Sequence, residues 1–332
     1  MKRFTLLLYI FFSSSTATSN IDTNYVKLYK EDFILKLSTS TTRDVFKYSN
    51  KLNQKIDLVP NQDLNVGIGL AYRWLIVNFS MKALDLRDNA IYGKSFQSRL
   101  GTQAFIGKSY FKFLYSNFKG FYISNIDELN ANWKSEDKYP SFPNLRIQNF
   151  SLSHTYSFNG TRFSLKPIVV GNQVITKSCG SLLVTTQIEW FKLNNDSTIA
   201  NLFNNPNDRQ QLKSFEAIPL TLKVGYGYNF NISEKVDIIG SLTVGGGLDF
   251  QRYNTPKSSF KELKSTLDAE SFIGFMFNHD YWFNSITMYS TLSTHDLNQS
   301  SFLNLNNTIQ LNIGYRFKNK KRLKWIGNSI GL

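Results

Sequence analysis

The chain has 332 residues, a formal net charge of +14 and 15% aromatic residues. Its basic residues are spread along the chain outside one C-terminal cluster, and no nucleic-acid-binding module is evident, which argues against a nucleic-acid partner. After the N-terminus, no stretch approaches the roughly 18 consecutive apolar residues of a membrane-spanning helix, so helical spans are excluded.

The N-terminus has the parts of a secretory signal. Lys2 and Arg3 precede the apolar run from Phe4 to Phe12, and small polar residues follow. This run is too short to cross a bilayer, and no cysteine lies near its end to carry a lipid anchor. We predict a cleaved signal peptide at 1–19, a single domain at 20–317, and a basic C-terminal tail at 318–332.

Alternating apolar and polar residues mark the strands of this domain. The clearest run extends from Ile218 to Phe230, and others include Leu64 to Tyr72 and Ile309 to Phe317. Successive side chains of a strand point to opposite faces, so each run has one apolar and one polar face. Many such runs behind a signal peptide predict an all-β fold, an antiparallel up-and-down transmembrane β-barrel of the bacterial outer membrane.

Thirteen candidate strands can be marked in chain order. They are 33–49, 55–72, 75–81, 97–106, 110–124, 145–158, 161–170, 180–192, 217–230, 236–253, 263–278, 281–294 and 305–317. Asn159-Gly160 predicts a tight hairpin between two of them. Because single-chain bacterial barrels have an even number of strands, we predict twelve, with fourteen as the alternative. Thirteen is odd, so one strand has been split or missed. We place this error around residues 161–215, where the short turns no longer all fall on one side of the membrane.

The last strand should close the barrel against the first, near 33–49, because an open edge cannot be left unpaired in lipid. Its apolar face carries Ile309, Leu311, Ile313, Tyr315 and Phe317. An aromatic-bearing final strand is what the barrel-assembly machinery is expected to recognise, and we name that machinery as a partner. The tail that follows departs from this pattern.

Several stretches together resemble one family of outer-membrane barrels from Bacteroidota, known only as domain of unknown function 4421. The resemblance rests on Asp22–Lys27, Pro60–Tyr72, Lys119-Gly120-Phe121-Tyr122, the strand from Arg146, and Gln173–Ser181. The family more often has alanine at the position of Cys179. The resemblance implies a barrel and export, and it implies no activity.

The charged residues on polar faces are the candidate site. If alternation holds, they point into the lumen, where they could line a pore and set its selectivity, or cross-link a closed interior. They are Arg73, Lys166, Glu189, Lys223, Asp237, Asp249, Lys264, Asp268, Glu270 and Arg316.

Other chemistry has weaker support. His154 lies on an apolar face, and its neighbours Ser151 and Ser153 point the other way, so a serine on an adjacent strand would be needed for a lipid-facing Ser-His pair. We expect no metal and no cofactor, because no His, Cys and acid spacing fits a metal site. Cys179 is the only cysteine, so no internal disulfide can form.

These observations leave three functions open. The leading hypothesis is a non-enzymatic pore or solute-binding barrel for a small solute. The second is a structural or partner-binding barrel, although no protein partner can be named. The third is a lipid-modifying enzyme. Outer-membrane lipid is expected to surround the chain in each case.

Overall fold

The computed structural model describes residues 21–29, 33–50, 54–61, 63–130, 132–134, 137–198, 212–297 and 300–317. The predicted signal peptide at 1–19 and the predicted basic tail at 318–332 lie outside these residues, as does residue 20 at the start of the predicted domain. In the described part, no helix is long and apolar enough to cross a membrane.

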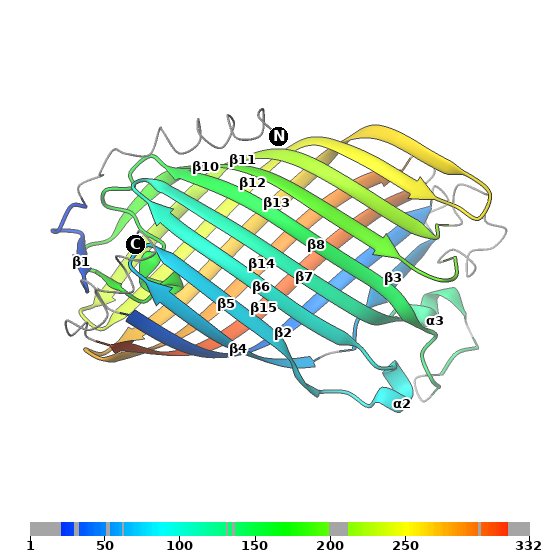
Figure 1. The fold of residues 1–332 in the computed structure, drawn as a ribbon, viewed down its shortest axis with the longest axis horizontal. Coiled ribbons are helices and arrows are strands. Elements are labelled where there is room, and N and C mark those ends of the chain that lie inside the picture. Colours follow the sequence, from blue (N-terminus) through cyan, green and yellow to red (C-terminus); the bar gives the residue numbers. More distant parts are fainter. Residues whose placement is uncertain are drawn as a thin grey trace, which may run out of the picture.

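Strands dominate these residues (Figure 1). They are β1 (Val26–Leu28), β2 (Phe33–Asn50), β3 (Lys55–Val59), β4 (Asp63–Tyr72), β5 (Leu75–Asp85), β6 (Phe96–Ile106), β7 (Ser109–Ile123), β8 (Ser141–Ser157), β9 (Gln173–Ile175), β10 (Cys179–Asn194), β11 (Ser214–Ser233), β12 (Val236–Asn254), β13 (Ser259–Asn278), β14 (Trp282–Leu297) and β15 (Ser300–Phe317). Three short helices are α2 (Asn89–Tyr92), α3 (Ile126–Leu129) and α4 (Lys166–Val169).

Twelve of the strands form a closed antiparallel ring. The order around it is β2-β4-β5-β6-β7-β8-β10-β11-β12-β13-β14-β15, and β15 pairs with β2 from Phe33↔Phe317 to Asn50↔Ser300. Neighbours in the ring are also neighbours along the chain once β3 and β9 are set aside, which is the up-and-down arrangement. The predicted fold class and the predicted twelve strands are confirmed.

The outward surface is apolar and the inward surface polar. On β11, Leu222 is 55% exposed whereas Lys223 is 1% exposed, and the same alternation runs along the neighbouring strands. A closed ring satisfies every backbone group of its strands, and a band of outward apolar side chains is what a barrel presents to lipid. The protein is therefore a transmembrane barrel of the bacterial outer membrane, as predicted.

The structure differs from the predicted strands at residues 55–72 and 159–170. Residues 161–170 form turns and α4 instead of a strand, because Pro167 cannot donate to a sheet ladder and lies at the start of a helical turn. The Asn159-Gly160 hairpin is wrong for the same reason, since the chain does not return as a ring strand until Cys179. The predicted strand 55–72 is two strands, β3 and β4.

The two ends of the barrel differ. Phe33 and Phe317 lie at one end together with tight turns such as Arg73-Trp74, where Arg73 has a φ of 54°. The strand ends that flank the longer connections 86–95, 124–140 and 195–213 lie at the other end. Outer-membrane barrels have short periplasmic turns and long external loops. We therefore refer to the periplasmic end and the outer end.

At the outer end, β3 replaces β4 as the neighbour of β2 in the ring. β2 pairs with β4 up to Thr41↔Leu64, and farther out it pairs with β3 from Phe46↔Leu58. β3 in turn pairs with β7 at Leu58↔Ile123 and Val59↔Tyr122, so it bypasses β4, β5 and β6. The connection with α2 projects from this side (Figure 1). The lumen is thus bounded by fewer strands at its outer end than at its periplasmic end.

Candidate functional site

Aromatic side chains close the lumen at the outer end. We name six of them the outer layer: Phe46, Phe118, Phe121, Phe191, Phe215 and Phe302. The Phe46 ring lies 5.6 Å from Phe121, 6.2 Å from Phe191 and 6.0 Å from Phe302, measured between centroids. These rings come from β2, β7, β10 and β15, so they meet across the lumen rather than along one wall.

One polar pair is buried within this outer layer. His295 Nδ1 lies 2.6 Å from Asp249 Oδ2, and both side chains are fully buried. The imidazole ring stacks on Phe191 at 5.4 Å, and Gln251 donates to the same carboxylate at 2.6 Å. Asp249, one of the predicted lumen charges, therefore stabilises a closed layer and lines no passage.

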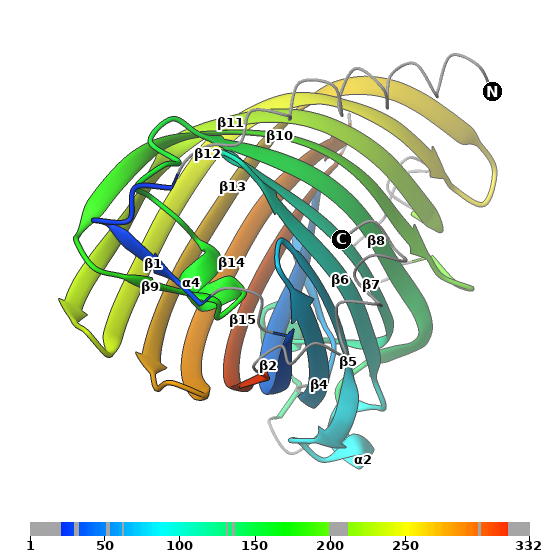
Figure 2. The same ribbon diagram turned by 60° about the vertical axis from the view of Figure 1, so that its left-hand side comes forward.

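A separate segment closes the periplasmic end. We name residues 158–178, between β8 and β10, the lid. Its helix α4 lies on the inner side of the strands, close to β1 and β9 (Figure 2). Ile168 and Val170 of the lid contribute to a buried apolar cluster with Ile239, Met276 and Phe283 of the wall.

Two buried cations hold the C-terminal end of α4. Lys36 Nζ donates to the Val169 carbonyl at 2.7 Å, and Arg316 Nε donates to the Gly171 carbonyl at 2.6 Å. Cations at a helix C-terminus satisfy carbonyls that have no partner within the helix. Lys36 and Arg316 come from β2 and β15, so the strands that close the ring also hold the lid.

The N-terminal segment holds the lid from the other side. β1 pairs with β9 of the lid from Val26↔Ile175 to Leu28↔Gln173. Asp22 accepts from Arg162 Nε at 3.1 Å, and its backbone N–H donates to the Thr161 carbonyl at 2.9 Å. The backbone N–H of Asn24, together with Arg162, holds the pKa of Asp22 below its usual range.

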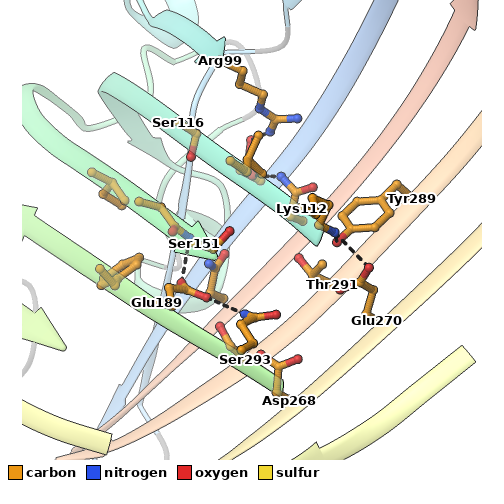
Figure 3. Close-up of a pocket in the computed structure, with 18 of the residues that line it drawn as sticks. Arg99, Lys112, Ser116, Ser151, Glu189, Asp268, Glu270, Tyr289, Thr291 and Ser293 are labelled. Atoms are coloured by element: carbon orange, nitrogen blue, oxygen red, sulfur yellow. Dashed lines mark hydrogen bonds and ion pairs between the residues drawn. The ribbon is translucent and has the colours of Figure 1, made fainter. Parts of the chain in front are cut away.

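A polar chamber lies between the outer layer and the lid. It consists of two adjoining cavities of about 90 and 230 Å³ that share the wall residues Arg99, Lys112, Glu270 and Tyr289. Figure 3 shows the smaller one, with these side chains pointing toward one another from strands on opposite sides. The larger one reaches the lid at Leu165, Ile168 and Val169.

Ion pairs cross the chamber. Lys223 Nζ lies 2.6 Å from Asp268 Oδ1 and 3.5 Å from Glu270 Oε2, and Lys112 Nζ lies 2.9 Å from Glu270 Oε1. Lys112 also donates to the Tyr289 hydroxyl. A carboxylate shared by two ammonium groups offsets the cost of taking each charge out of water.

Two further groups complete the network. Arg99 lies 3.3 Å from Asp44 and donates to Thr308 at 2.9 Å. Glu189 accepts from Asn149 at 2.7 Å and from Gln187 at 3.0 Å, and Gln187 accepts from Lys223 at 2.9 Å. The chamber therefore carries matched numbers of cations and anions: Lys36, Arg99, Lys112 and Lys223 against Asp44, Glu189, Asp268 and Glu270.

The remaining predicted charges lie elsewhere. Asp237 and Arg316 are buried at the periplasmic end, where both bind the Asn278 amide, at 2.9 and 2.7 Å. Lys264 is on the inward face near the outer end, 3.8 Å from Glu262.

Two predicted lumen positions need correction. Arg73 is exposed in the β4–β5 turn, because alternation stops where the chain reverses. Lys166 is not on a strand; it begins α4 of the lid, with its ammonium 5.6 Å from the Phe105 ring centroid.

Four chamber charges escaped the sequence analysis: Lys36, Asp44, Arg99 and Lys112. Lys36 lies between outward Leu35 and Leu37, so alternation could have found it. Arg99 and Lys112 had weaker signals, because β6 carries small polar residues on both faces and β7 carries aromatic residues on both faces.

His154 has the neighbour that a lipid-facing pair would need. Its Nε2 lies 3.0 Å from Ser109 Oγ on β7, and its ring stacks on Phe111 at 4.7 Å. Within the described residues no side chain binds the other ring nitrogen. The described part also contains no group of three metal-ligating side chains, and Cys179 is partly buried at the start of β10.

Comparison with known proteins identifies the family. The profile described as a domain of unknown function (DUF4421) matches residues 20–317. No curated protein matches the sequence.

Solved structures that resemble the chain are barrel proteins. Outer membrane protease OmpT from Escherichia coli has 8% identity and a TM-score of 0.38, with 89% of this chain and 100% of that chain covered. The translocator domain of autotransporter NalP from Neisseria meningitidis has 13% identity and a TM-score of 0.42, with 85% and 88% covered. The β domain of the Bordetella autotransporter BrkA has 8% identity and a TM-score of 0.37, with 84% and 98% covered. At these identities, the similarity does not indicate an activity, a substrate or a partner for this chain.

Proposed function

The chain belongs to the DUF4421 family of domains of unknown function, and on that premise we propose a non-enzymatic outer-membrane barrel that holds a small polar solute in its chamber. The solute enters from the periplasmic side when the lid moves. The Bacteroidota origin that the resemblance implies stays an expectation, as does recognition by the assembly machinery.

The observation that carries this proposal is the difference between the two closures. The outer layer consists of side chains of the wall itself, whereas the lid is a separate segment held by β1, Lys36, Arg316 and one apolar cluster with the wall. A segment outside the ring can open locally without breaking a ladder of the wall, so its opening costs less free energy than opening the wall. Because the chamber has matched charges, it favours a solute with no net charge.

Access of a thiol reagent to the chamber tests the proposal. Thr287 lines the larger cavity, so Thr287→Cys in a Cys179→Ala background reports access to it. We expect a small sulfonated methanethiosulfonate to label this cysteine slowly in the otherwise native barrel and much faster when Lys36→Met and Arg316→Met are added. Glu234→Cys, in an exposed periplasmic turn, should react rapidly in both backgrounds.

The structural or partner-binding barrel is the second candidate, favoured by the ion pairs that cross-link the interior. If Thr287→Cys stays unreactive with the lid fastenings removed while Glu234→Cys reacts, the chamber is a structural interior and this candidate replaces the first. Rapid labelling of Thr287→Cys in the native barrel would show an open lumen and refute both readings.

A further inference from the structure

A row of basic side chains lies on the outward surface near the outer end. We name Lys119, Arg146, Lys192, Arg252 and Lys261 the basic row; they stand on β7, β8, β10, β12 and β13. Arg252 is two residues beyond Phe250 and Lys261 two residues before Leu263, and both hydrophobic side chains are exposed. Residues two apart on a strand share a face, so the row borders the apolar band on its outer side.

Strand register brings members of the row directly together. Lys119 is the cross-strand partner of Arg146, and Arg252 is the cross-strand partner of Lys261. Like charges directly opposite one another destabilise a sheet, because their β-carbons are only about 5 Å apart. An anion between the two members of each pair would offset this repulsion.

Within the described residues, the register places one carboxylate beside the row. Glu216 lies between Lys192 and Arg252 in the register, and it accepts from Trp190 Nε1 at 2.7 Å. No basic side chain of the row forms an ion pair with a described residue. Arg146 Nε donates to the uncharged Asn117 amide at 2.8 Å. An anion for the two pairs would therefore come from the surroundings, where the row borders the apolar band.

We propose that the basic row binds the phosphate groups of the phosphorylated glycolipid in the outer leaflet. Paired cations suit a phosphate, which accepts charge-assisted hydrogen bonds from several donors at once. Trp190 stands beside the row, where outer-membrane barrels place aromatic residues at the membrane interface. The row lies at the end with the long loops, which places it in the outer leaflet and not the periplasmic one.

Lipid selection around the reconstituted barrel tests this inference. The full chain is placed in phosphatidylcholine nanodiscs doped with bisphosphorylated lipid A, with lipid A lacking its phosphates, or with phosphatidylglycerol, and bound lipid is counted by native mass spectrometry. We expect enrichment of bisphosphorylated lipid A by the native chain. We expect loss of that enrichment in a variant with Lys119→Gln, Arg146→Gln, Arg252→Gln and Lys261→Gln.

A matched control removes as many charges from the periplasmic end. Arg73→Gln, Lys108→Gln, Lys177→Gln and Lys235→Gln lie in turns or in the lid, and this variant should keep the enrichment. Heat-modifiable migration on a gel shows that each variant is folded. Unchanged enrichment in the basic-row variant, or equal enrichment of lipid A without phosphates, would overturn the proposal. Equal enrichment of phosphatidylglycerol would reduce the row to a general anion-binding surface and also overturn it.

Discussion

At the scale of single residues, the two faces of β11 differ in what they tolerate. Leu222 points to lipid, and Leu222→Arg should lower the free energy of unfolding by about 2–4 kcal/mol if it lies near the midplane. Its neighbour Lys223 is buried between two carboxylates. Urea titration of the barrel in lipid vesicles measures the loss, and Leu222→Ile serves as the control with little effect.

Replacing Lys223 should also lower the free energy of unfolding, because this side chain is buried in the closed lumen. Lys223→Met leaves Asp268 without its partner, and breaking a buried pair in this way costs roughly 3–5 kcal/mol. Adding Asp268→Leu should restore part of the loss, since no uncompensated charge then stays behind. A double-mutant cycle by urea titration measures this. Losses that simply add would show that the two groups do not interact.

The Ser109–His154 contact should have no catalytic role. Its imidazole has one hydrogen-bonded serine, whereas nucleophilic catalysis also needs a group that orients the base. We expect His154→Ala and Ser109→Ala to leave the rate of fatty-acid release from outer-membrane lipid at background, equal to that of the native chain. Release by the native chain that both substitutions abolish would establish the lipid-modifying alternative.

At the scale of elements, Gly171 limits how the lid can sit. Its φ is +88°, and a β-carbon there would overlap the Phe283 ring. Gly171→Ala should therefore displace the lid and accelerate labelling of Thr287→Cys without opening the ring. Gly240→Ala is the matched control, because nothing lies within 4 Å of a β-carbon at that position.

The closing strand should be indispensable and the tail dispensable. β15 pairs with β2 along its whole length, so deleting 309–332 removes half of that ladder and exposes two edges in lipid. Deleting 320–332 leaves every described strand intact. Heat-modifiable migration should survive the shorter deletion and disappear with the longer one. The reverse result would mean that another strand closes the ring.

Sequence alternation succeeded where each strand could be treated alone. Strands such as β11 and β12 carry one apolar face throughout, so alternation places Lys223 and Asp249 on the opposite face, and both side chains are buried. The lid was not predictable in this way, because 161–170 mimics a strand until Pro167 is taken into account. The closed lumen was not predictable either. Phe46, Phe191 and Phe302 are far apart in sequence, and their contact depends on the distance across the barrel.

At the scale of the whole molecule, closure at both ends predicts the electrical behaviour. The outer layer and the lid place buried apolar clusters across the lumen near its two ends. A planar bilayer that contains the native chain should therefore show no steady current, whereas an open porin gives large steps. A steady current from the native chain would contradict the closed lumen, and an open porin reconstituted in parallel provides the positive control.

The insertion of β3 also gives the barrel a mechanical weak point. Around most of the ring, lateral tension in the membrane would be resisted by ladders that run the length of the strands, such as β11–β12. Between β3 and β7 the ladder of the described residues is short: it has the pairs Leu58↔Ile123 and Val59↔Tyr122, and the Ser124 N–H extends it with a bond to the Asp57 carbonyl at 2.9 Å. Stretching the bilayer should therefore widen the outer rim first along this seam, so that the rim yields at one azimuth instead of expanding evenly.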